Sequence, residues 1–181
     1  AIRRRQLEIA ETDEGLTIIR EWALKKLRNQ LDFLDQLSRR RPEKEDVFTS
    51  PVATLVNCLA RITELSGTID EMRGTIMGLE GNAGRAYFGC LSDLMPQEFR
   101  FEGRSRQPAK DEFNAMLNYA YGVLYSQVER ACIIAGLDPF VGFLHTDNYN
   151  KKSLVFDMIE PFRILADRCV AFLFTGRKVR K

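Results

Sequence analysis

The chain has 181 residues and a net charge of +2 at pH 7, with 29% charged and 45% apolar residues, as in an ordinary globular domain. This length suits one domain with a sizeable core, and so small a net charge gives no argument for nucleic-acid binding. No apolar run is long enough to span a bilayer, so we expect no membrane partner. Nucleotide-binding and serine-hydrolase functions have no support, because the sequence contains no Walker A loop and no GxGxxG or GxSxG motif.

The spacing of apolar residues predicts two helices in the first third of the chain. The first runs over about residues 13–37, with Lys26 largely off its apolar face. The second is predicted to begin at Ser50 and Pro51, because a serine cap followed by proline at the first helical position is a typical helix start. It is predicted to end near Glu64.

A third helix is predicted from about Thr68, and its sequence contains the glycines Gly74, Gly78, Gly81 and Gly84. Each glycine costs roughly 0.5–1 kcal/mol relative to alanine inside a helix. The pattern favours close packing of another helix as the compensation, and the alternative is close approach of a ligand or nucleic-acid backbone beside Glu80. Glu80 lies next to the apolar stripe, where an unpaired carboxylate would be costly, so it needs a cation, a hydrogen-bond partner or water.

The segment over residues 95–113 is predicted to be a loop that Phe99 and Phe101 anchor to the core. Its basic side chains are Arg100, Arg104, Arg106 and Lys110. Planar guanidinium groups suit phosphate contact, and a merely solvated basic loop is an equal alternative.

A fourth helix is predicted over about residues 111–135, with Gly136 as its C-terminal cap. One side of it carries a polar and aromatic ridge formed by Asn114, Asn118, Tyr121 and Tyr125. Such a ridge either hydrogen-bonds a neighbouring helix or lines a cleft and contacts DNA.

His145, the only histidine, precedes a polar loop and a last helix. Ser153 is predicted to cap that helix, which would place Asp157 and Glu160 on one face. Pro161 has no amide hydrogen to donate, so the helix should kink beside the acids. Taken alone, these residues favour a hydrogen-bonded histidine beside a solvated acidic face, and the alternative is a divalent-metal site.

The cysteines and the two chain ends indicate the cellular compartment and whether the chain is part of a longer protein. The cysteines are scattered, without a CxxC pair, at Cys58, Cys90, Cys132 and Cys169. In apolar helical contexts they fit reduced thiols, so we expect a cytoplasmic protein. The chain begins with Ala1, has a basic lead-in over about residues 1–12 and closes with a basic tail over residues 175–181, so we expect a part of a longer protein.

Three segments together resemble the signature blocks of a known family, CRISPR-associated protein one, the integrase that inserts spacers during CRISPR adaptation. They read EGNAGRAYF, FRFEGRSRQPAKDEFNAMLNYAYGVLYSQVERA and GLDPFVGFLHTDNYNKKSLVFDMIEPFR. The resemblance covers almost the whole chain. It implies an all-α fold over residues 1–181, namely the multi-helix catalytic domain of that family.

The resemblance also implies a metal site and a reaction. By matching position, Glu80, His145 and Glu160 would bind Mg²⁺ or Mn²⁺, with Asp157 close behind them or as an alternate ligand. The implied activity is that of a metal-dependent DNA endonuclease and integrase, in which a DNA 3′-hydroxyl attacks a phosphodiester at the edge of a CRISPR repeat. The family's DNA-binding positions map to Arg85, Arg104, Arg106, Lys110, Asn114 and Tyr121.

The implied partners are prespacer and repeat DNA, CRISPR-associated protein two and a second copy of the chain. The family's N-terminal β-rich dimerisation domain is absent from this sequence, and some relatives carry a fused reverse transcriptase. A non-catalytic helical module that docks DNA or protein in the same complex is the main alternative. An unrelated metal nuclease would share the three ligands but not the other blocks.

Overall fold

The structure is a computed structural model that describes residues 2–10, 12–145 and 151–179. Over these ranges the chain forms helices and no strand, which confirms the predicted all-α class. The α-helices are α1 (Ile2–Ile9), α2 (Asp13–Arg39), α3 (Glu45–Thr63), α4 (Ile69–Leu94), α5 (Glu112–Ile134), α6 (Ser153–Met158) and α7 (Arg163–Thr175). Short 3₁₀ turns are η1 (Pro42–Lys44), η2 (Gln97–Phe99) and η3 (Glu160–Phe162).

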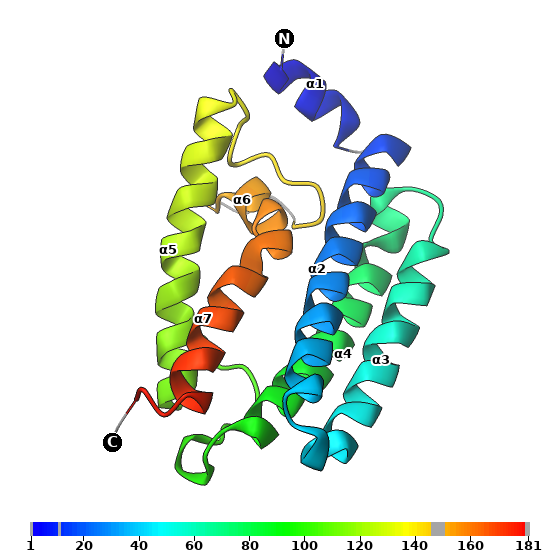
Figure 1. Cartoon of the computed structure of the whole chain (residues 1–181). Coiled ribbons are helices and arrows are strands. Elements are labelled where there is room, and N and C mark those ends of the chain that lie inside the picture. The colour runs from blue at the N-terminus through cyan, green and yellow to red at the C-terminus, as the bar shows by residue number, and fades with distance from the viewer. Residues whose placement is uncertain (1, 11, 146–150, 180–181) are drawn as a thin grey trace.

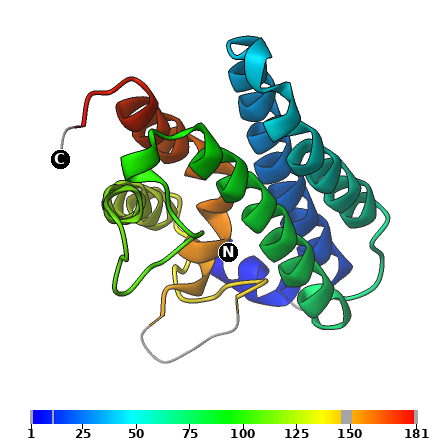
Figure 2. The same cartoon turned by 90° about the horizontal axis from the view of Figure 1, so that it is seen from below.

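The helices form two groups that face each other (Figures 1 and 2). Helices α2, α3 and α4 pack together on one side, and α5 packs with α6 and α7 on the other. The turn η3 joins the groups, because it packs on α2 while continuing into α7. Helix α1 lies at one end of the molecule, and the chain leaves at the opposite end. Any site between α4 and η3 therefore lies between the two groups.

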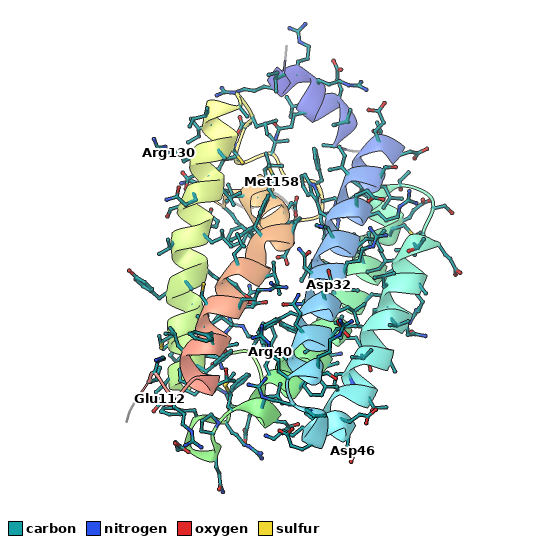
Figure 3. All side chains as sticks on the ribbon, in the orientation of Figure 1. Asp32, Arg40, Asp46, Glu112, Arg130 and Met158 are labelled. Carbon is teal, nitrogen blue, oxygen red and sulfur yellow. The ribbon has the colours of Figure 1, made fainter. Side chains whose placement is uncertain are left out.

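Aromatic and apolar side chains join α5 to the basic loop, to α6 and to α7, and Figure 3 draws the side chains on the ribbon. Phe101 of the basic loop stacks on Phe113 of α5, with ring centroids 4.3 Å apart, and Phe113 packs on Phe174 of α7. Met158, at the end of α6, contacts Cys132 of α5. Phe101 is 7% exposed, so the prediction that it anchors the basic loop is confirmed.

The predicted start of the second helix is wrong. Helix α3 begins at Glu45, so Pro51 lies inside the helix. Phe48 is buried in the first turns, and Glu45 and Asp46 occupy the helix N-terminus, where negative charge is favourable. Burial of Phe48 and the helix dipole thus extend the helix ahead of Pro51, at the expense of the one hydrogen bond that proline removes.

The last predicted helix is interrupted, as Pro161 indicates. Helix α6 ends at Met158, η3 carries Glu160 and Pro161, and α7 starts at Arg163. The predicted cap is wrong in detail: Ser153 is the first residue of α6, and Lys152 occupies the N-cap position without a side-chain cap. Ser153 is fully buried against Gly142, where an added Cβ would lie 2.5 Å from the Ser153 Cβ. The loop over residues 146–150 lies outside the described residues.

Two further expectations concern membranes and thiols. Within the described ranges, no helix has both the length and the apolarity needed to cross a membrane. All four cysteines are free thiols, and Cys58, Cys90 and Cys132 are buried as expected. Cys169 is exposed on α7, so its predicted packing in an apolar context is wrong.

Candidate metal and nucleic-acid site

A cleft of about 650 Å³ lies where α2, α4, α5, the basic loop and η3 meet. All three predicted metal ligands, Glu80, His145 and Glu160, line it. The predicted DNA-binding residues that also line it are Arg85, Arg104, Arg106 and Tyr121. Residues far apart in sequence are thus brought to one concave surface.

The two glutamates of the cleft share one cation. The Lys26 ammonium lies 3.0 Å from Glu80 Oε1 and 2.7 Å from Glu160 Oε2, and Arg163 Nε donates to Glu160 Oε1 at 2.9 Å. Burial alone would raise the pKa of Glu160, but the positive charges of Lys26 and Arg163 outweigh it and lower that pKa. Burial would also lower the pKa of Lys26, and the charges of Glu160 and Glu80 raise it instead. Glu160 is therefore held ionised, and Lys26 holds the two carboxylates close together.

His145 is held by a different set of contacts. Its Nδ1 lies 2.5 Å from Asp157 Oδ1, and Asp157 accepts backbone N–H groups from Phe143 at 2.6 Å, Leu144 at 3.0 Å and His145 at 3.1 Å. Arg73 of α4 donates to the carbonyls of Phe143 and Leu144 from the other side. Since Nδ1 faces Asp157, only Nε2 of His145 is left for another ligand.

The donor set of the cleft fits a hard divalent ion. Carboxylate oxygens are the ligands that Mg²⁺ and Mn²⁺ prefer, and imidazole binds Mn²⁺ as well. Glu160 Oε2 is buried, and the Lys26 ammonium lies 2.7 Å from it. The Lys26 ammonium itself shows that the two carboxylates accept a shared cation. Among the described residues, however, no three His, Cys, Asp or Glu side chains are already grouped as metal ligands.

The prediction that Asp157 and Glu160 share one helix face is wrong, because the helix breaks between them: Asp157 lies on α6 and Glu160 on η3. Asp157 has a fully buried side chain and uses both oxygens on the segment that carries His145. Glu160 points to α2 and α7 instead. In this arrangement Asp157 orients His145 and has no oxygen left over for a metal.

The basic loop is fixed by the polar ridge of α5. Asn114 accepts from Arg104 and from the Ser105 amide, and its Nδ2 donates to Gly103 O at 2.9 Å. Asn118 accepts from Arg104 Nη2 at 2.8 Å and donates to two further loop carbonyls. The two asparagines of the ridge therefore hold the loop, a use that was not predicted. Tyr121 of the same ridge hydrogen-bonds Asp167 of the neighbouring helix α7 and lines the cleft, as the two alternatives had it.

Two predicted DNA-contacting residues do not reach the cleft. Asn114 is fully buried, so it positions Arg104 and does not itself face a ligand. Lys110 is exposed on the loop but does not line the cleft. Arg104 itself lies over the rings of Phe88 and Tyr121, with centroid distances of 5.5 and 5.4 Å, so it enters the cleft already oriented.

Tyr121 links the arginines to a buried acid. Its hydroxyl donates to Asp167 Oδ1 at 2.5 Å, and Arg163 lies over its ring at 4.6 Å. Burial raises the pKa of Asp167 to about 6, although the Tyr121 hydroxyl and the charge of Arg163 act against that rise. Asp167 thus fixes Tyr121, and Tyr121 supports Arg163 beside Glu160.

The glycines of α4 are not packed against another helix, so that interpretation is wrong. A Cβ added at Gly74, Gly78 or Gly84 would meet no atom within 4 Å, and one at Gly81 would meet only Arg85. Gly81 and Gly84 line the cleft beside Glu80. The open face of α4 favours the alternative, in which a ligand or nucleic-acid backbone approaches closely.

Several residues of the site were missed from the sequence: Lys26, Arg73, Arg163 and Asp167. Lys26 lies off the apolar stripe of α2, which is the usual place for a solvated lysine, yet its side chain is 16% exposed. The one available signal was the need of Glu80 for a partner, and it did not indicate which cation would supply it.

The sequence profile of the family described as CRISPR associated protein Cas1 matches residues 1–181, the whole chain. The chain belongs to the Cas1 family. A Cas1 relative from Archaeoglobus fulgidus, named CRISPR-associated endonuclease Cas1 1, is 35% identical over 190 residues, which cover 98% of this chain and 55% of that protein. The chain thus spans about half the length of the curated relatives it matches.

Solved structures show the same fold. A casposase bound to its integration product is 28% identical, with a TM-score of 0.82, over 99% of this chain and 48% of that one. A chain of a Cas6-RT-Cas1–Cas2 complex has a TM-score of 0.84 at 24% identity, over 97% of this chain and 18% of that one. The fold of this chain is therefore that of the helical region in Cas1-type proteins.

Proposed function

We propose that this chain is the catalytic region of a metal-dependent DNA endonuclease and integrase that inserts spacer DNA into a CRISPR array. The observation that carries the proposal is one cleft in which Glu80, Glu160 and His145 line a wall beside Arg85, Arg104 and Arg106. Paired carboxylates next to converging guanidinium groups suit a phosphodiester and the metal that activates it. Family membership and the casposase likeness support the same reaction class.

Glu80, Glu160 and Nε2 of His145 would hold Mg²⁺ or Mn²⁺, which when bound stabilises charge on the phosphate and the leaving oxygen. Asp157 keeps the imidazole turned toward the cleft through Nδ1. Arg104, held by Asn114 and Asn118, would bind a phosphate without reordering its side chain, because its position is fixed before DNA arrives. The glycine face of α4 would let the DNA backbone approach closely, since no Cβ stands in its way.

The substrate would be a short DNA whose 3′-hydroxyl attacks a phosphodiester at the edge of a CRISPR repeat. One bond to phosphorus forms as another breaks, so the reaction needs no nucleotide cofactor and no covalent enzyme intermediate. We propose CRISPR-associated protein two as a partner, because a fold neighbour is part of a Cas1–Cas2 complex. A second copy of the chain and a fused reverse transcriptase remain proposals on the same footing.

One observation favours the alternative, a non-catalytic module that docks DNA or protein. Each predicted ligand already has a partner within the chain: the two glutamates contact Lys26, and His145 contacts Asp157. Such contacts also occur where buried polar residues serve packing alone. A docking module would keep complex assembly after the glutamates are neutralised and would show no reaction that depends on them.

Strand transfer tests the two functions directly. The full natural chain, with CRISPR-associated protein two, is incubated with labelled short DNA and a plasmid that carries a repeat. We expect Glu80→Gln and Glu160→Gln to reduce covalent joining at least about 100-fold, because metal stabilisation of the transition state contributes several kcal/mol. Glu64→Gln, an exposed change at the C-cap of α3, should leave joining unchanged. Joining that survives both cleft variants, or its absence in the wild type with intact assembly, would contradict the enzyme proposal.

A further inference from the structure

We propose that Lys26 is a resident cation of this site, which holds Glu80 and Glu160 together and competes with the divalent ion for them. The inference rests on the proposed function, since it concerns the same carboxylates. Its ammonium contacts both glutamates within 3.0 Å, and the side chains of Lys26, Glu80 and Glu160 are 16%, 11% and 11% exposed.

The charges of the cleft explain why such a cation is needed. Glu80 and Glu160 carry two negative charges, and Lys26 and Arg163 carry two positive charges, so the four groups are balanced without a metal. A divalent ion added to this set leaves two uncompensated positive charges. A phosphodiester compensates one of them, and its transition state compensates both. Metal and DNA should therefore bind more tightly together than either binds alone.

Gln30 offers the Lys26 ammonium another hydrogen-bond acceptor when a metal binds the two glutamates. Gln30 lies one turn further along α2, so it shares a face of the helix with Lys26. It is 4% exposed, lines the same cleft, and its Oε1 has no hydrogen-bond partner in the described part of the chain. A buried amide oxygen without a partner is an acceptor that the displaced ammonium can use. Lys26 would then stay on the cleft wall and add its charge to the phosphate-binding arginines.

The test is an Mn²⁺ titration followed by electron paramagnetic resonance, on the full natural chain with and without a short DNA duplex. In the wild type we expect DNA to tighten Mn²⁺ binding at least about tenfold. Lys26→Met removes the competing charge, so the Mn²⁺ affinity measured without DNA should rise by roughly tenfold or more. The factor by which DNA tightens Mn²⁺ binding should then be smaller than in the wild type. Lys26→Arg keeps the charge and should bind Mn²⁺ no more tightly than the wild type.

Lys25→Met is the matched control, because Lys25 is the neighbouring lysine of α2 and is exposed. It should change none of these values. Equal or weaker Mn²⁺ binding in a folded Lys26→Met protein would overturn the inference. If Lys26→Met does not fold, a wild type whose Mn²⁺ affinity is the same with and without DNA would overturn it instead. Absence of Mn²⁺ binding in every variant, with or without DNA, would overturn the metal-dependent function as well.

Discussion

The two sides of the cleft are built in different ways. On one side, Asp157 of α6 holds the segment over residues 143–145 through its three backbone amides and the His145 ring. On the other, Glu80 and Glu160 are held mainly by the charges of Lys26 and Arg163. Backbone hydrogen bonds to a buried carboxylate are directional and cannot be exchanged without loss of local structure. Ion pairs at the edge of a cleft can exchange one cation for another.

This difference indicates that the two sides of the cleft have different roles. The histidine side is part of the fold, so its position is fixed before any ligand binds. The carboxylate side can exchange its cation, which is what the proposed metal site requires. Each prediction below tests whether the two sides respond differently to change.

The largest effect is expected from Asp157→Asn. An amide nitrogen would face N–H groups that now donate to a carboxylate, so at least one buried donor loses its partner. We expect a loss of about 3 kcal/mol or more in the free energy of unfolding, measured in urea. Amide hydrogen exchange at Phe143 and Leu144 should accelerate sharply.

Glu160→Gln is the comparison on the other side, and it should leave the exchange of those two amides unchanged. Asp70→Asn, on a side chain that is 80% exposed, should change stability by less than about 0.5 kcal/mol. The contrast between the sides fails if Glu160→Gln exposes the amides as much as Asp157→Asn does.

The next effect concerns the pH dependence of stability through Asp167, which supports the carboxylate side through Tyr121. The pKa of Asp167 is raised to about 6, from 3.8, because the group is buried. A raised acid pKa contributes stability that is fully present below about pH 4 and is lost as pH rises through about 6. Relative to Asp167→Asn, the wild type should lose about 2 kcal/mol of unfolding free energy between pH 4 and pH 7.

Urea unfolding of both proteins at several pH values gives this difference. The difference between the two proteins is the useful quantity, because Glu160 has a lowered pKa and therefore the opposite effect. Its contribution to the unfolding free energy is lost as pH falls in the acidic range, and it is the same in both proteins. A constant difference across the range would show that Asp167 ionises as freely in the folded chain as in the unfolded one.

The smallest effect comes from one substitution made on both sides, glycine to alanine. Gly78 is exposed on α4 with no atom within 4 Å of an added Cβ, so Gly78→Ala should raise stability by about 0.5–1 kcal/mol. DNA affinity, measured by fluorescence anisotropy, should fall if the α4 face contacts the backbone. Gly142→Ala should instead destabilise, because its Cβ would lie 2.5 Å from Ser153 Cβ and 2.8 Å from His145 O. Equal signs for the two stability changes would contradict the contrast.

Periodicity predicted the helical class and most helix positions, since apolar spacing and a cap such as Gly136 act locally. It failed at Pro51, where burial of Phe48 outweighs a strong local start signal. The family resemblance placed Glu80, His145 and Glu160 on one cleft, but neither spacing nor resemblance could show that Lys26 pairs the glutamates. That contact joins α2 to α4 and η3, so it depends on how the helix groups pack.

The order of the cleft residues along the chain affects when the site can exist during synthesis. Lys26 lies on α2, Glu80 on α4, and Glu160 on η3, which follows almost all of the core-forming helices. A nascent chain folds from its N-terminus as it leaves the ribosome, so the cleft cannot close until η3 has emerged. A prematurely terminated product that lacks η3 therefore lacks Glu160 and Arg163, so its cleft is left without two of the four charged groups that meet there.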